Sequence, residues 1–82
     1  MGVYYYFFNE RTSEMNKKPL PNSSCSWVAK LNSIDDEYVL TAFKNVIKIN
    51  GWKTTDQIIA RADYPGFPSI KFEDGNIEYL ES

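Results

Sequence analysis

The side chain with the greatest intrinsic reactivity in this sequence is that of Cys25, the only cysteine among 82 residues. A cysteine nucleophile acts as the thiolate, which is usually produced by a neighbouring base such as histidine or by a second cysteine two residues away. The sequence has no histidine and no second cysteine. Because an unassisted thiol is mostly protonated at neutral pH, we interpret Cys25 as inert.

Acid–base chemistry would have to use carboxylates, and the best placed are Asp35, Asp36, Asp56 and Asp63. All four lie at predicted helix starts or turns, where aspartate commonly accepts hydrogen bonds from free backbone N–H groups. The sequence also lacks the ligands of a zinc site, a dense acidic loop for calcium and the glycine patterns of nucleotide-binding loops. It therefore predicts a protein that is not an enzyme and that uses no cofactor or metal ion.

Charge and composition restrict the other classes of function. Nine basic and eleven acidic side chains give a net charge of −2, so the basic excess typical of nucleic-acid binders is missing. There is no charged-then-apolar leader and no apolar run near membrane length, from which we expect no membrane partner and a cytoplasmic location. Aromatic residues make up 16% of the chain, and they are the expected means by which a small chain builds enough core.

The element expected to organise the fold is a long helix within residues 33–51. At 100° per residue its apolar side chains fall on one half of the helix and its charged side chains on the other. Ser33 is the expected N-cap, and the acidic residues 35–37 complement the helix dipole. Gly51 supplies the left-handed residue that ends the helix. The pattern predicts an amphipathic helix that packs on a sheet.

Two strands are predicted before this helix, joined by a polar surface connection or hairpin excursion over residues 10–24. Residues 3–9 are β-branched and aromatic, which favours a strand. Alternation predicts one face made of Val3, Tyr5 and Phe7 and another made of Tyr4, Tyr6 and Phe8. The second face would either lie under a loop or stack a ligand. Residues 25–31 form the other strand, with Trp27, Ala29 and Leu31 toward the core.

The region after the helix contains turn signals and one ambiguous segment. Thr54 and Gln57 fit a capping box, which favours a short helix through Ala62; a strand over residues 57–63 stays the alternative. Residues 64–68 form a turn, with Pro65 and Gly66 at the central positions of type II. A two-residue turn at residues 74–75 predicts a hairpin of strands 69–73 and 76–80.

Residues 66–75, with the sequence GFPSIKFEDG, resemble the segment around the cis-proline of thioredoxin and protein disulfide isomerase domains. The resemblance implies a cis peptide bond before Pro68 and a hairpin at one edge of the sheet. The chain has no Cys-x-x-Cys motif and no predicted helix directly after its first strand. A thioredoxin-like domain without the redox cysteine pair is therefore the third interpretation of function, and no redox role is carried over.

The predicted fold is α+β: one domain over residues 1–82, with an antiparallel sheet of about four strands and the long helix on one face. The predicted order is β-β-α-(α or β)-β-β. Because no catalytic group is present, we expect the domain to bind another protein, as an inhibitor, adaptor or regulator. Aromatic residues are enriched at binding hot spots, and the predicted patch consists of Trp52, Tyr64, Pro65 and Phe67.

Two other uses of these aromatic side chains are open. The rings of the predicted patch would alternatively close the open end of the core. The strand face made of Tyr4, Tyr6 and Phe8 would alternatively stack single-stranded nucleic acid, although nucleic acid is not the expected partner. The identity of the partner and the oligomeric state are not predicted.

Overall fold

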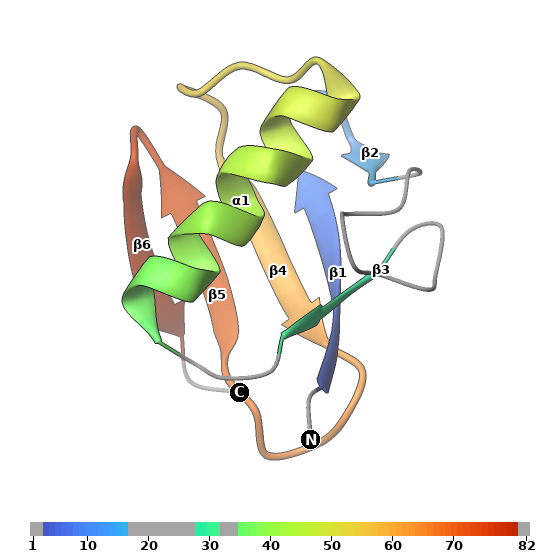
Figure 1. Cartoon of the computed structure of the whole chain (residues 1–82). Helices are drawn as coiled ribbons and strands as arrows, with labels where there is room; N and C mark the ends of the chain where they lie inside the picture. Colours follow the sequence, from blue (N-terminus) through green and yellow to red (C-terminus); the bar gives the residue numbers. More distant parts are fainter. Residues whose placement is uncertain (1–2, 17–27, 32–34, 81–82) are drawn as a thin grey trace.

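The computed structural model describes residues 3–16, 28–31 and 35–80. Its elements are β1 (Val3–Asn9), β2 (Glu14–Met15), β3 (Val28–Leu31), α1 (Asp36–Asn50), β4 (Ile58–Ala62), β5 (Ser69–Glu73) and β6 (Asn76–Leu80). In Figure 1 the helix crosses one face of a single sheet. No helix in the described part of the chain is long and apolar enough to cross a membrane.

All strand pairs in the sheet are antiparallel, and the order across it is β2-β1-β4-β5-β6. β3 also pairs with β1, beside residues 3–6, whereas β2 pairs with residues 8–9 of the same strand. The described strands therefore occupy five positions across the sheet. The predicted helix-on-sheet arrangement is found, but the prediction of about four strands is wrong, because β4 adds a central strand.

The helix begins at a side-chain cap and ends at a left-handed glycine. Asp35 is extended, and its carboxylate accepts a hydrogen bond from the backbone N–H of Glu37 at 3.1 Å. Asp35 therefore holds the N-cap position, and Ser33, the predicted N-cap, lies outside the described residues; serine and aspartate are about equally good N-caps, so residue type could not separate them. Gly51 ends the helix with φ of 70°, as predicted, in the left-handed region that glycine adopts without strain.

The core lies between α1 and the sheet face that it covers. Phe43 is fully buried at the centre of the core. Its ring packs edge-to-face against Phe7, with 5.1 Å between the ring centroids, and stacks on Phe72, with 5.4 Å between the centroids. The other buried helix residues are Val39, Ala42, Val46 and Ile47, and the sheet contributes Tyr5, Ile58, Ala60 and Ile70. The predicted burial of Tyr5 and Phe7 on one face of β1 is confirmed.

Of the two predictions for the segment after Gly51, the favoured short helix is wrong and the alternative strand is confirmed, because Ile58–Ala62 forms β4 between β1 and β5. Ile58, Ile59 and Ala60 are all buried. Three consecutive buried positions suit a central strand, which has neighbours on both sides, better than a one-sided surface helix. The capping box is also absent: the carboxylate of Asp56, not the side chain of Thr54, accepts a backbone N–H in this turn.

The turns and the hairpin follow the sequence closely. Asp74 and Gly75 have φ of 53° and 83°, the two positive values of a type I′ turn, so the predicted hairpin is confirmed. It forms one edge of the sheet, as the thioredoxin-like resemblance implied, but the peptide bond before Pro68 is trans, contrary to that implication. The predicted second strand is described from Val28 onward, so Cys25 and Trp27 lie outside the described residues.

Candidate functional site

Three of the four predicted binding residues meet in the β4–β5 loop, residues 63–68. Tyr64 is 65% exposed and Phe67 is 37% exposed. Their ring centroids are 6.1 Å apart with an interplanar angle of 68°, which is an edge-to-face contact. Pro65, which follows Tyr64, is also exposed. We call Tyr64, Pro65 and Phe67 the aromatic loop patch.

The loop that carries this patch is tied to β1 at both ends. The backbone N–H of Asp63 donates to the carbonyl oxygen of Tyr4 at 3.0 Å. At the other end, the hydroxyl of Tyr5 donates to the carbonyl oxygen of Pro68, also at 3.0 Å. Burial raises the pKa of the Tyr5 hydroxyl, which keeps it protonated as a donor. The exposed rings therefore stand on a loop whose backbone is fixed by the sheet.

Trp52, the fourth predicted residue, is not part of this patch. It follows the end of α1, whereas the aromatic loop patch follows the opposite end of β4. The five residues of β4 lie between these two parts of the chain and span roughly 16 Å. Trp52 is buried in the core cluster, and its indole N–H donates to Oε1 of Glu14 at 3.3 Å. Of the two predicted uses of these rings, Trp52 therefore has the alternative one: it packs in the core.

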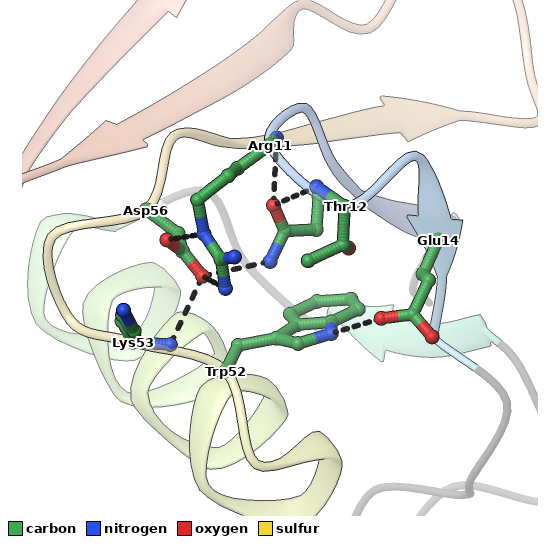
Figure 2. A network of polar contacts seen from close by, with 7 residues as sticks. Arg11, Thr12, Glu14, Trp52, Lys53 and Asp56 are labelled. Carbon is green, nitrogen blue, oxygen red and sulfur yellow. Dashed lines mark hydrogen bonds and ion pairs between the residues drawn. The ribbon is translucent and has the colours of Figure 1, made fainter.

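A polar network that the sequence did not reveal surrounds Asp56 (Figure 2). Its carboxylate accepts from Nε and Nη2 of Arg11 at 2.5 and 3.0 Å, from Nδ2 of Asn9 at 2.9 Å and from the backbone N–H of Lys53 at 3.0 Å. Asn9 in turn accepts the backbone N–H groups of Arg11 and Thr12 through its side-chain oxygen. The network joins the β1–β2 turn to the turn before β4.

The electrostatics of Asp56 argue for a structural role. The hydrogen bonds from Arg11, followed by those from Lys53 and Asn9, hold the pKa of its carboxyl far below the ordinary range. A carboxylate that remains ionised and already accepts four hydrogen bonds is poorly suited to receive a proton from a substrate. A shallow depression beside it is lined by Glu10, Arg11, Lys53, Thr55 and Gln57. The Asp56 carboxylate therefore fixes two turns of the chain.

A third cluster lies on the sheet face away from α1. Tyr4, Tyr6 and Phe8 are half-buried there, on the opposite side of β1 from the core residues Tyr5 and Phe7. Strand pairing places Arg61 opposite Tyr6, and Lys71 opposite Ile59. Directly opposed residues in an antiparallel pair share a face. The basic neighbours that this aromatic face lacks in the sequence are thus supplied by β4 and β5.

The three clusters differ in what they can contact. The carboxylate of Asp56 already accepts four hydrogen bonds from within the chain, whereas the rings of the aromatic loop patch are exposed and those on the face of β1 are half-buried. Comparisons with protein-family models, with curated proteins and with solved structures find no match to this chain. Function must therefore be inferred from the chemistry of its own residues.

Proposed function

We propose that this protein is a small non-catalytic binding module that contacts another protein through the aromatic loop patch. The observation that carries the proposal is the exposed pair of rings of Tyr64 and Phe67, which contact each other edge-to-face. Tyrosine and other aromatic residues dominate binding hot spots because they bury a large area and lose few rotatable bonds. Such a module acts as an inhibitor, adaptor or regulator by occupying part of its partner's surface.

The anchoring of the loop supports the same proposal. Binding is weakened when interface side chains and loops must be ordered on association. Here the bonds from Asp63 and from the Tyr5 hydroxyl fix the loop backbone before a partner arrives. Pro65 restricts the backbone further, since its ring fixes φ. The patch is therefore pre-organised for binding.

The proposal is tested by affinity capture from an extract of the host cells, with the tagged 82-residue chain as bait. We compare the wild-type chain with a Tyr64→Ala/Phe67→Ala double variant. Tyr38→Ala is the matched control, because Tyr38 is also a partly exposed tyrosine, 39% exposed, but lies on α1. We expect proteins that the wild type and Tyr38→Ala retain equally and that the double variant does not retain.

Thermal unfolding of the same three proteins separates binding from stability. Exposed side chains usually change stability by no more than about 0.5 kcal/mol, so the double variant should melt near the wild-type temperature. Retention of the same proteins by the double variant would refute the proposal. Loss of retention together with a large fall in melting temperature would assign the two rings to packing instead.

Single-stranded nucleic acid is the second candidate ligand, and the position of Arg61 beside Tyr6 favours it. Aromatic side chains stack bases, and nearby cations contact the phosphates. This candidate predicts that affinity for a labelled oligonucleotide falls steeply with salt concentration and that Arg61→Gln weakens it. A flat titration at low salt would remove this candidate.

A further inference from the structure

Within the described residues, the outer edge of β6 is not paired with another strand. β6 pairs with β5 on one side, and no other described strand pairs with it. Glu73 and Asn76 close a two-residue turn, so this pair exchanges both of its hydrogen bonds and bonded pairs then alternate along the strands. The backbone groups of Asn76, Glu78 and Leu80 therefore face β5. Those of Ile77 and Tyr79 point outward from the sheet.

Exposed strand edges of this kind bind extended peptides, which add to the sheet as a further strand. β6 has five residues, none of which is proline, so its outward donors at Ile77 and Tyr79 are intact. The edge is short, and backbone pairing alone gives little specificity. The side chains beside it must therefore determine which peptide fits.

The side chains around this edge are predominantly acidic. The side chain of Glu78 is 63% exposed on the sheet face away from α1. On the other face, the hydroxyl of Tyr79 donates to Oδ1 of Asp36 at 2.8 Å, which places the acidic first turn of α1 beside β6. The nearest cation on β5 is Lys71, whose Nζ lies 3.6 Å from Oε1 of Glu78. An added strand that carries positive charge would complement both faces.

A second copy of this chain fits the edge less well. Antiparallel pairing of two β6 strands that keeps both helices on one side and uses all five residues centres on Glu78. That register places the carboxylate of Glu78 directly opposite its own copy. Like charges at directly opposed positions destabilise a strand pair, so the charge pattern favours a basic peptide over self-association.

We propose that the β6 edge binds an extended basic segment of the partner as an added antiparallel strand. The backbone of the segment bonds with Ile77 and Tyr79, and a lysine or arginine lies opposite Glu78. This inference deepens the proposed protein-binding function and rests on it. Leu80 pairs with Ser69, the first residue after the β4–β5 loop, so one partner chain can contact the edge and the aromatic loop patch together.

The probe is a capped, fluorescently labelled seven-residue peptide in which valine and lysine alternate, with lysine at the centre. Its binding to the 82-residue chain is measured by fluorescence anisotropy and by the shifts of amide signals in NMR spectra. In the proposed register the valines exchange backbone bonds with Ile77 and Tyr79, and the N–H of the lysine opposite Glu78 points away. N-methylation of the valines should therefore weaken binding at least tenfold, because backbone bonds are lost. N-methylation of the central lysine should leave binding unchanged.

Charge variants test the same register. Glu78→Lys should weaken binding of the valine–lysine peptide roughly tenfold, because an opposite-charge pair becomes a like-charge pair, and should strengthen binding of a matched valine–glutamate peptide. Glu10→Lys is the control, since it makes the same change of charge in the turn that follows β1, and β4 and β5 lie between β1 and β6. It should have a much smaller effect.

Several results would overturn the inference: equal binding of both N-methylated peptides, equal effects of Glu78→Lys and Glu10→Lys, no binding of any peptide, or a wild-type chain that dimerises through β6. Failure of the peptide to bind while the Tyr64→Ala/Phe67→Ala comparison still succeeds would refute the edge inference alone. Peptide binding that survives failure of that comparison would support the edge and refute the aromatic loop patch.

Discussion

The replacement of Phe43 by alanine is the most demanding test of the fold. Phe43 is fully buried near the middle of α1 and touches both β1 and β5 through Phe7 and Phe72. If α1 covers the sheet as described, no other side chain can fill the space that the ring leaves. The variant should therefore lose both the transfer free energy of the ring and the packing of the two rings against it.

The magnitude of this loss follows from the contacts. Removing a buried phenylalanine ring usually costs about 3–5 kcal/mol. Two aromatic pairs, each worth about 0.5–1.5 kcal/mol beyond area burial, place Phe43 in the upper half of that range. The whole domain of this size is expected to have about 4–12 kcal/mol of unfolding free energy. Phe43→Ala should therefore remove a third or more of the stability.

Urea unfolding monitored by circular dichroism measures this change, with Phe43→Leu as the matched control. Leucine keeps most of the apolar volume and should cost less than about 1.5 kcal/mol. The fall in melting temperature should be about 4–8 °C for each kcal/mol in a domain of this length. A loss below about 1 kcal/mol for Phe43→Ala would contradict the placement of α1 over the centre of the sheet.

Three further predictions concern acid stability, the loop anchor and the helix end. The pKa of Asp56 is lower in the folded than in the unfolded chain, so the stabilisation that its carboxylate contributes is complete above the ordinary pKa of about 3.9 and is lost as pH falls below it. Between pH 6 and pH 3, denaturant titrations should therefore show a smaller loss of unfolding free energy in Asp56→Asn than in the wild type, and equal losses would refute the reasoning. Tyr5→Phe removes the bond to the carbonyl of Pro68, which should cost about 0.5–1.5 kcal/mol and speed amide exchange at Phe67; unchanged exchange would show that this bond does not fix the loop. Gly51→Ala should lower the unfolding free energy by about 1–2 kcal/mol, because φ of 70° strains any residue with a Cβ atom while the space around it is open; a stabilised variant in a thermal melt would contradict this origin.

The parts of the fold that the sequence predicts well are those specified by local signals. The amphipathic period and Gly51 define α1, and the pair at residues 74–75 defines the β5–β6 hairpin. The alternation of residues 3–9 correctly assigns Tyr5 and Phe7 to the core. Each of these signals acts within a few residues of the element that it specifies.

The errors occur where distant segments decide the outcome. Residues 58–62 are too short for a decisive period, and they become a strand because β1 and β5 provide hydrogen-bonding partners on both sides. Arg11 and Asp56 are 45 positions apart, so no local sequence pattern predicts their ion pair. Apart from the β5–β6 hairpin, the sequence does not predict the order of the strands, and it is the pairing of β1 with β4 that brings Arg61 beside Tyr6.

The candidate site shows the same division. Tyr64, Pro65 and Phe67 are neighbours in one turn, so the sequence could group them correctly. Trp52 is aromatic and lies nearby in the sequence, so the sequence wrongly predicts that it belongs to the same patch. The physical reason for the error is β4, which runs the length of the sheet between residue 57 and residue 63 and carries the chain to the opposite end.

The central claim is that this protein acts by binding through Tyr64 and Phe67. The most direct measurement is calorimetric titration of a captured partner against the wild-type chain and the Tyr64→Ala/Phe67→Ala variant. A hot spot worth about 2 kcal/mol or more predicts that the Kd of the variant rises at least about thirtyfold while its melting temperature stays near that of the wild type. An unchanged Kd would contradict the claim.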